Sequence, residues 1–338
     1  MKYAILKNPA HTKVSFKDTD DLAVSELTVI APQIGAKDIA LECIGGVQYI
    51  VFNGPKSLSN ADVTTLSRLS FAYAIFAVQD NGLFSPIQFD ANCFINQELS
   101  TILKYVGKTN ELFTRFMLNL AQNSIAGPVA SSYNILDPVA GKGTTLYEAL
   151  IQGHNAYGME IDAKLVGETV VYMKKYLETA RYKHENHAEK TSGQTPSGKF
   201  TAVRNQIKIT RTKGEEPRHF EIVAGDTRHI SSCFKKNHFH AIIADLPYGV
   251  QHSSKKPGTA GFTRNATGLL AEALPGWAKV LKPGGVIVLA WNLFLIPRAT
   301  MEELLTSHGF AVKDKGVNFA HWVDNAINRD IIVATLQN

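Results

Sequence analysis

The stretch ILDPVAGKGTT, residues 135–145, predicts a buried strand that ends in Asp137, a glycine turn, and a helix that begins at a threonine. Gly141 and Gly143 allow the backbone to turn tightly and to approach a ligand without a Cβ in the way. The turn is not a P-loop, because Lys142 lies between the glycines, whereas a P-loop has Gly-Lys-Ser/Thr in sequence. It is not a GxGxxG motif either. An acid without a phosphate cradle favours a nucleoside with an uncharged tail over a pyrophosphate. An ordinary strand–helix turn is the alternative.

On the carboxyl side of this stretch, apolar segments alternate between strand and helix patterns. The alternation predicts an α/β fold with a doubly wound sheet, whose ligands bind at the carboxyl ends of its strands. Only a loop separates the last two strands, so we expect them to be antiparallel neighbours at one edge. The predicted strands cover 133–137, 156–160, 219–224, 240–245, 285–291, 311–318 and 329–336, and the predicted helices cover 144–152, 163–181, 266–282 and 298–308.

Two further acids follow predicted strands. Glu160, in the motif GMEID, lies 23 residues after Asp137, about where nucleotide-binding units hold a ribose diol. Asp226, in the motif AGDTR, could accept a hydrogen bond from an adenine amine. The alternatives are a helix-starting acid for Glu160 and a Gly-Asp turn for Asp226. Together with the glycine turn, these acids predict an adenosyl ligand.

The motif IIADLPYG, residues 242–249, combines three groups after one strand. The strand delivers Asp245 to the carboxyl edge of the sheet. Pro247 restricts the backbone, so the carbonyl of Leu246 projects outward instead of entering a helix. Tyr248 offers a flat ring on which a base could stack. Two acceptors and an aromatic face suit an exocyclic amine on a planar ring, whereas a purely structural turn would not need all three.

The amino-terminal part, residues 1–103, predicts a small α+β domain, with RNA docking as one use for it. A helix is expected from Asp20 to Pro32, where the proline stops it, and a hairpin over 39–52 around Gly45-Gly46. Residues 64–78 are ambiguous between helix and strand. The remaining residues, 104–338, form the second predicted domain, which opens with an amphipathic helix over 110–121 that Thr109 or Asn110 can cap.

The chain has 338 residues and a formal net charge of +5. Residues 181–219 hold nine basic and four acidic side chains, so this segment alone accounts for that charge. We expect residues 183–218 to be a basic insertion, partly ordered, with a short ribbon over 203–210. A second basic stretch contains Lys255, Lys256 and Arg264. Phosphate groups of a nucleic acid would explain both, and a solvated loop is the alternative.

Composition excludes several classes. With 45% hydrophobic and 19% charged residues, the chain is not disordered, collagen-like or a coiled coil. Three cysteines without CxxC spacing argue against a disulfide framework or a thiolate zinc site and favour the reducing cytoplasm. No apolar run approaches the roughly 20 residues that span a bilayer, and no signal peptide is predicted. The histidines have no partners at ligand spacing, so no metal site is predicted.

The motifs DPVAGKGTT, GMEID, GDT and DLPYG, in this order, resemble those of S-adenosylmethionine-dependent amino-methyltransferases. The likeness covers about residues 104–338 and is greatest to the branch of tRNA guanine-N2 methyltransferases that often carry a THUMP domain. It implies a Rossmann-like methyltransferase sheet with an antiparallel last strand, and S-adenosylmethionine as cofactor. It also implies RNA, with tRNA as the expected class, as partner, in a cytoplasmic enzyme for which a monomer is the working expectation.

The resemblance also implies roles for residues. Asp137 and the glycine turn would hold the methionine part of the cofactor, Glu160 the ribose and Asp226 the adenine, while residues 104–110 close over the methionine end. Asp245, the Leu246 carbonyl and Tyr248 would bind the target amine, whose nitrogen attacks the sulfonium methyl directly. The implied cofactor-binding residues are Thr109, Asp137, Pro138, Gly141, Gly143, Thr144, Glu160, Ile161, Asp226 and Thr227; the implied catalytic residues are Asp245, Leu246, Pro247 and Tyr248.

The chain departs from the family pattern at three places. Leu246 replaces the commoner first proline, Lys142 lies where a small residue is usual, and residues 1–103 are too few for a full THUMP module with its usual companion. Two other enzyme classes therefore stay open, namely DNA adenine-N6 and protein glutamine-N5 methyltransferases, although both usually show two prolines. A catalytically silent RNA-binding subunit is the third alternative.

Overall fold

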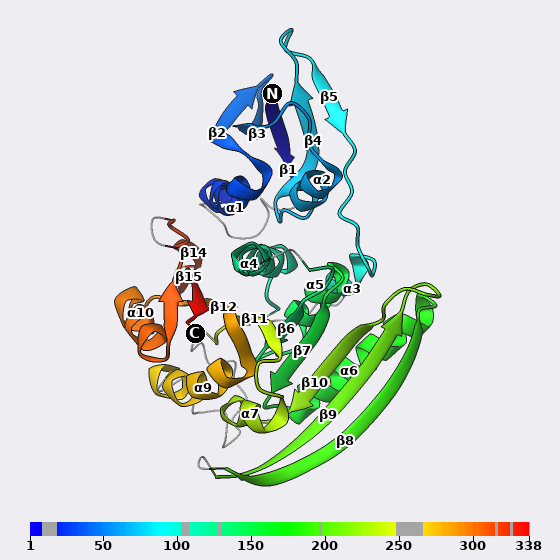
Figure 1. Cartoon of the computed structure of the whole chain (residues 1–338), viewed down its shortest axis with the longest axis vertical. Coiled ribbons are helices and arrows are strands. Elements are labelled where there is room, and N and C mark those ends of the chain that lie inside the picture. The colour runs from blue at the N-terminus through cyan, green and yellow to red at the C-terminus, as the bar shows by residue number, and fades with distance from the viewer. Residues whose placement is uncertain are drawn as a thin grey trace.

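The computed structural model describes residues 1–8, 19–102, 108–127, 130–195, 198–247, 266–314, 317–324 and 327–337. Two sheets are present among them, a smaller antiparallel sheet and a larger mixed one (Figure 1). Together they confirm the predicted α/β class with an additional small α+β unit. The predicted domain boundary near residue 103 lies outside the described residues and stays a prediction.

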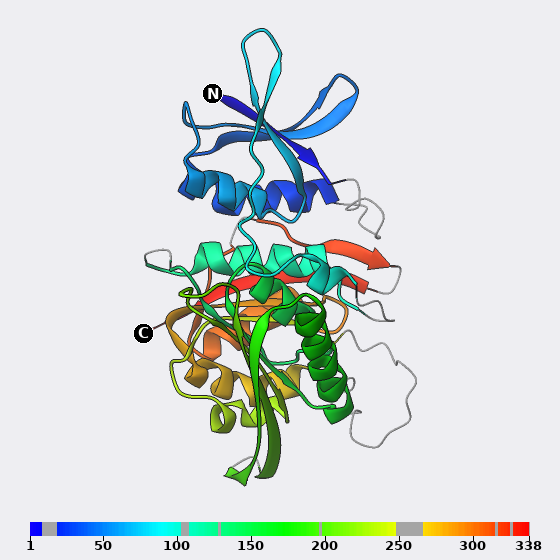
Figure 2. The ribbon, with the colours of Figure 1, turned by 90° about the vertical axis from the view of Figure 1, so that its right-hand side faces the viewer.

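The small sheet has the strand order β2-β3-β1-β4-β5 in the described part of the chain. Its helices α1 and α2 lie between this sheet and the rest of the molecule (Figure 2). Tyr3, Ile5, Ile50, Phe52 and Ile75 turn toward these helices and form a core with them. The elements are β1 (Lys2–Lys7), α1 (Thr19–Ile34), β2 (Lys37–Ile44), β3 (Val47–Asn53), α2 (Asn60–Ser67), β4 (Ala72–Val78) and β5 (Phe84–Ile87).

The helix and hairpin predicted in this unit are confirmed, with one correction. The helix does not stop at Pro32, which lies inside α1. It ends instead at Ile34, because the next residue, Gly35, adopts a positive φ of 65°, and the amide of Ala36 then donates to the carbonyl of Ala31. A proline so close to a helix end removes only one backbone hydrogen bond. The ambiguous residues 64–78 contain the end of α2 and the whole of β4.

The large sheet follows the path β13-β15-β12-β11-β6-β7-β10-β9-β8 among the described residues, and β14 pairs with β15. Strands β10, β7, β6, β11 and β12 are mutually parallel, which is a doubly wound order. β15 runs antiparallel between β12 and β13, so the predicted antiparallel neighbour is confirmed. The strands are β6 (Asn134–Asp137), β7 (Asn155–Glu160), β8 (Lys183–Thr195), β9 (Gly198–Thr210), β10 (Arg218–Ala224), β11 (Phe239–Asp245), β12 (Leu281–Asn292), β13 (Phe310–Val312), β14 (His321–Asp324) and β15 (Ile327–Leu336).

Helices cover both faces of this sheet. α4, α5 and α6 share one hydrophobic core with one set of strand residues, and α7, α9 and α10 share a second core with the alternate set. One predicted strand, 311–318, is too long: β13 ends at Val312, because the buried carboxylate of Asp314 turns to Arg298 and to the amide of Val333. The helices are α3 (Glu98–Thr101), α4 (Glu111–Ser124), α5 (Thr144–Ile151), α6 (Ala163–Thr179), η2 (Thr227–His229), α7 (Ile230–Cys233), α9 (Ala266–Val280) and α10 (Arg298–Ser307).

The basic insertion is a long hairpin rather than a partly ordered arm. β8 and β9 pair from Lys183–Thr210 to Thr195–Gly198, and β9 continues the sheet beside β10 (Figure 1, green, lower right). The predicted ribbon over 203–210 is the part of β9 that lies beside β10, and residues 198–202 continue past the carboxyl end of β10. The side chains of β8 are nearly all exposed, so a polar sequence without apolar alternation can still form this edge strand.

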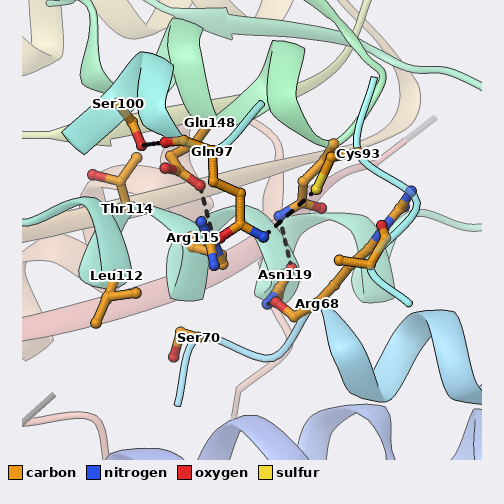
Figure 3. Close-up of polar contacts among 12 residues, drawn as sticks. Arg68, Ser70, Cys93, Gln97, Ser100, Leu112, Thr114, Arg115, Asn119 and Glu148 are labelled. Atoms are coloured by element: carbon orange, nitrogen blue, oxygen red, sulfur yellow. Dashed lines mark hydrogen bonds and ion pairs between the residues drawn. The ribbon is translucent and has the colours of Figure 1, made fainter. Parts of the chain in front are cut away.

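A buried polar cluster joins α4 to α1 and to the residues after α2; Figure 3 shows its members Arg68, Ser70 and Asn119. The side-chain amide of Asn119, in α4, donates to Glu26 Oε1 of α1 at 2.6 Å and to the carbonyl of Arg68 at 2.8 Å. Glu26 is fully buried and also accepts from the amide and the hydroxyl of Ser70. Burial raises the pKa of Glu26 to about 7, although these hydrogen bonds favour the charged form.

This raised pKa predicts a pH dependence of stability. Between the ordinary pKa near 4.5 and the native value near 7, the folded state binds more protons at Glu26 than the unfolded state does. The free energy of unfolding should therefore fall as pH rises from about 5 to 8. Gln resembles the protonated acid, so Glu26→Gln should show a smaller fall in chemical denaturation experiments across this range. An equal pH slope in the variant and the wild-type protein would contradict the prediction.

Every helix in the described residues is too short or too polar to cross a membrane.

Candidate functional site

Four carboxylates lie along one edge of the large sheet. Asp137, Glu160 and Asp245 end the parallel strands β6, β7 and β11, and Asp226 follows β10. Because β10, β7, β6 and β11 are neighbours in this order, the acids follow one another as Asp226, Glu160, Asp137 and Asp245. The structure thus brings together the acids that the strand-end argument selected.

Asp137 lies at the centre of this row and is 4% exposed. Its Oδ1 accepts from the amide of Val139 at 3.0 Å. The pKa of Asp137 is raised to about 7, chiefly by burial and also by the nearby charges of Asp245 and Glu160, against hydrogen bonds from Thr145 and Val139. Mutual repulsion among these carboxylates means that a cation bound between them would be stabilised.

The glycine turn is fixed to Glu160. Glu160 Oε2 accepts from the amide of Gly141 at 2.9 Å, and its Oε1 accepts from the amide of Asp162 at 2.9 Å. Gly141 has a φ of +53° and open space where a Cβ would project, whereas Gly143 has a φ of +84° and begins α5. A Cβ on Gly158 would meet that of Ala140 at 2.9 Å. The backbone around the glycine turn is therefore closely packed at Gly158, whereas space remains beside Gly141.

Three other predicted cofactor residues flank the turn. Pro138 and Thr144 are buried beside Asp137 and Gly143. Ile161, next to Glu160, is 57% exposed, which is unusual for a large apolar side chain at a strand end that is otherwise well packed. Lys142 points to α6, where its Nζ lies 2.8 Å from Glu168 Oε2. This ion pair gives the unusual lysine of the glycine turn a structural role.

Asp226, which follows β10, has a basic partner that the sequence analysis did not predict. Asp226 is held by Arg228, whose Nη2 and Nε donate to Asp226 Oδ2 at 2.6 and 3.0 Å. Burial by itself would raise the pKa of Asp226, but the hydrogen bonds from Arg228 outweigh it and the pKa is lowered. The hydroxyl of Thr227 accepts from the buried Trp277 Nε1 at 2.9 Å. The sequence analysis did not predict this ion pair, although Arg228 lies only two residues after Asp226.

At the fourth strand end, Asp245 Oδ2 accepts from the hydroxyl of Thr109 at 2.8 Å. Thr109 therefore does not cap α4; Asn110 does, because its Oδ1 accepts from the amides of Leu112 and Phe113. The amide of Leu246 donates to the carbonyl of Ala290 at 2.8 Å, and its side chain is 5% exposed. A proline could not make that hydrogen bond, which explains a leucine at this position.

The rest of this motif is only partly described. Pro247 is exposed. Tyr248, residues 104–107, and the basic residues Lys255, Lys256 and Arg264 lie outside the described residues. Within the described residues, no group of three or more His, Cys, Asp or Glu side chains is arranged to hold a metal ion.

The hairpin carries less unbalanced charge than its composition suggests. Arg204 lies 3.0 Å from Glu189 and 2.5 Å from Glu221, and Arg211 lies 2.7 Å from Glu215. Arg218 is 8% exposed and pairs with Glu216 at 3.6 Å. Four basic residues that sequence analysis counted on the arm are thus paired, since Lys208 also lies 3.9 Å from Glu185. Seven of the nine basic residues are exposed, namely Arg181, Lys183, Lys190, Lys199, Lys208, Arg211 and Lys213, and two of these seven, Lys208 and Arg211, are in ion pairs.

No protein-family model matches this chain, and no curated protein matches its sequence. Among solved structures, TrmN from Thermus thermophilus is similar over 88% of this chain and 59% of its own, with 15% identity and a TM-score of 0.42. The present chain thus spans less than two thirds of TrmN. Two other methyltransferases resemble the present chain over 62% and 61% of its own length.

The first of these two is a rRNA methylase from Streptococcus thermophilus, with 11% identity, 89% of its own chain covered and a TM-score of 0.34. The second is the 1,6-didemethyltoxoflavin-N1-methyltransferase of Burkholderia thailandensis, solved with S-adenosylhomocysteine, with 13% identity, 72% of its chain covered and a TM-score of 0.36. With likenesses this distant, the fold class rests on the strand order of the chain itself.

Proposed function

We propose that this protein is an S-adenosylmethionine-dependent methyltransferase that modifies an exocyclic amine of a base in RNA, with guanine N2 of tRNA as the target. One observation carries the proposal: four carboxylates follow one another along the carboxyl edge of a doubly wound sheet. Asp137 precedes the glycine turn, Glu160 contacts it, Asp226 follows β10, and Asp245 begins the DLPYG motif. This order suits an adenosyl cofactor on one side of an amine acceptor.

The residues present fit such a cofactor. Glu160 uses one lone pair of each oxygen on a backbone amide, so further lone pairs are available for a ribose diol. The exposed side chain of Ile161 could cover one face of an adenine ring, and Asp226 would accept from its amine. A Cβ on Gly141 would meet no described atom within 4 Å, so the methionine part could approach the backbone closely there. The row of carboxylates around Asp137 would stabilise the positive charges of the cofactor's sulfonium and ammonium groups.

The chemistry assigned to this chain is positioning. An exocyclic amine on an aromatic ring is a poor nucleophile, because its lone pair is delocalised into the ring. Asp245 and the carbonyl of Leu246 would accept its N–H groups and turn the lone pair toward the methyl. Bound S-adenosylmethionine supplies the electrophilic methyl carbon. As the new N–C bond forms and the S–C bond breaks, the amine loses a proton, which Asp245 is placed to accept. Such positioning can contribute several kcal/mol.

RNA as substrate is supported by the distribution of charge. The exposed cations of the β8–β9 hairpin project from the same sheet whose edge carries the acids. Residues 1–103, in contrast, hold seven basic and ten acidic side chains, so phosphate contacts are not expected there. A base in a duplex must leave its stack to reach Asp245, which costs a few kcal/mol and favours loops or flexible regions.

The test is incubation with labelled S-adenosylmethionine and separate pools of tRNA, rRNA, DNA and protein, followed by nucleoside and amino-acid analysis. We expect label in tRNA, as N2-methylguanosine. In calorimetry, Glu160→Gln should weaken cofactor binding about 10- to 100-fold, because hydrogen bonds to a charged acceptor are lost. Glu178→Gln, on the exposed end of α6, is the matched control and should bind normally. Label confined to DNA or protein, or a wild-type chain that does not bind the cofactor, would overturn the proposal.

A further inference from the structure

Two aromatic rings stand exposed at the carboxyl end of β12. Phe294, two residues after this strand, is 63% exposed, and Trp322, in β14, is 43% exposed. Their ring centroids are 5.7 Å apart, with an interplanar angle of 55°. Large aromatic side chains bury much apolar area when they pack in a core. A pair of rings that contact each other but remain exposed to solvent is therefore a candidate binding surface for a ligand.

The backbone that presents Phe294 is firmly held. The amide of Phe294 donates to Asn292 Oδ1 at 3.2 Å, and the amide of Leu295 donates to the Asn292 carbonyl at 2.9 Å. The buried Trp291 Nε1 donates to the carbonyl of Ile296 at 2.7 Å. The loop is thus tied to the core on both sides of Phe294, and the exposed ring does not reflect a loose segment. A ring on a fixed backbone is suited to binding a flat ligand at little entropic cost.

The position of the pair relative to the acids is set by the strand order. Asp245 pairs with Ala290 of β12, while Glu160 and Asp226 lie on the opposite side of β11, at β7 and β10. Trp322 is on β14, which pairs with β15, the neighbour of β12. β14 and β11 are three strand spacings apart. At roughly 4.8 Å per spacing, the distance between these two strands is on the order of 14 Å. That is too far for a base whose amine contacts Asp245, but suits the next nucleotide.

A series of contacts among buried residues links the neighbourhood of Asp245 to the strand that carries Trp322. Thr109, which donates to Asp245, is followed directly by α4, and the Phe113 ring of this helix lies 4.1 Å from the Arg329 guanidinium. Arg329 pairs with Asn292 of β12 and with His321, the residue before Trp322. An RNA strand that runs from Asp245 toward β14 along this edge of the sheet would reach the aromatic pair.

We propose that Phe294 and Trp322 form a stacking platform for the nucleotide next to the methylated one. The inference rests on the proposed function, because it takes RNA as the substrate. Stacking on aromatic rings accepts any base, so the platform adds affinity and register rather than sequence selectivity. It would hold the strand in place while the target base is turned out toward Asp245.

The tryptophan content allows a direct test. The chain has three tryptophans, of which Trp277 and Trp291 are 0% and 2% exposed, so a ligand that stacks on Trp322 changes the fluorescence of a single exposed indole. Short single-stranded RNA should quench the emission of the wild-type chain. In Trp322→Phe the quenching should disappear, while the affinity for dye-labelled RNA, measured by anisotropy, stays within about threefold.

Removing the rings should lower that affinity. We expect Phe294→Ala combined with Trp322→Ala to weaken RNA binding roughly 5- to 100-fold, with unchanged cofactor binding in calorimetry and an unchanged thermal transition. If the double variant does not fold, Phe294→Ala alone serves, with at least a threefold loss expected. Tyr73→Ala is the matched control, because this aromatic is 58% exposed but lies on the small sheet, and it should bind RNA normally.

The outcomes separate this inference from the proposed function. Quenching by RNA that Phe294→Ala weakens supports the platform, even if no methyl transfer is found. Methylation of RNA without quenching, and with normal affinity in the alanine variants, would overturn the platform and leave the proposed function intact. Quenching by peptides but not by RNA would overturn it as well. A failure to bind the cofactor or to methylate any RNA would overturn the proposed function and, with it, the position of the platform beside a methylated nucleotide, while the quenching by RNA still tests whether the two rings bind a base.

Discussion

Asp245→Asn is expected to lower the rate of methyl transfer on the order of 100-fold or more, with the affinity for S-adenosylmethionine nearly unchanged. Asp245 ends β11 and accepts from the hydroxyl of Thr109. An asparagine fills the same volume and can retain this contact, because a hydroxyl also accepts hydrogen bonds. It loses the charge and one acceptor oxygen, so the amine of the base is held less firmly and its proton has no basic acceptor. Losses of this size are typical when a positioning or proton-accepting group is removed.

The measurement is a single-turnover experiment with excess enzyme, combined with calorimetry for the cofactor. Asp162→Asn is the matched control. Asp162 caps α6 by accepting from the amide of Lys164, and asparagine caps helices equally well, so its rate should stay near that of the wild-type chain. Full turnover of Asp245→Asn with normal cofactor binding would remove Asp245 from the mechanism, whereas loss of cofactor affinity would place it in the cofactor site instead.

The strand-end acids show what local sequence can predict. Asp137, Glu160 and Asp245 each follow an apolar run, and parallel strands must bring their carboxyl ends to one edge. Their convergence follows from a local pattern and one topological rule. The same rule also located Asp226, but its partner Arg228 was missed, because a hydrogen bond between side chains two residues apart produces no hydrophobic periodicity.

Other features depend on contacts that are distant in the chain. Glu26 and Asn119 are 93 residues apart, and each is unremarkable in its own helix. Strand β1 lies at the centre of the small sheet, yet it is too short to display a period. β8 is an exposed edge strand of polar residues, so backbone pairing with β9 rather than apolar alternation creates it. In each case the stabilising partner is supplied by tertiary structure, which a single window of sequence does not contain.

The ion pair between Arg115 and Glu148 should dominate the stability of the region around the glycine turn (Figure 3). Arg115 Nε of α4 lies 3.0 Å from Glu148 Oε2 of α5, and their side chains are 11% and 0% exposed. Burial alone would lower the pKa of Arg115, but the charge of Glu148 outweighs it and keeps the guanidinium ionised. Glu148→Gln leaves this cation buried without a counter-charge, so we expect the free energy of unfolding to fall by about 3–5 kcal/mol.

Chemical denaturation of three variants tests whether an uncompensated charge is the cause. Arg115→Leu combined with Glu148→Leu should cost less than Glu148→Gln alone, because an apolar pair of similar volume leaves no unpaired charge. Glu185→Gln breaks an exposed pair whose atoms are 3.9 Å apart and should cost less than about 1 kcal/mol. A double variant at least as unstable as Glu148→Gln alone would show that lost packing explains the effect. Since α4 follows Thr109 and α5 follows Gly143, the same loss of stability would loosen both sides of the proposed cofactor site.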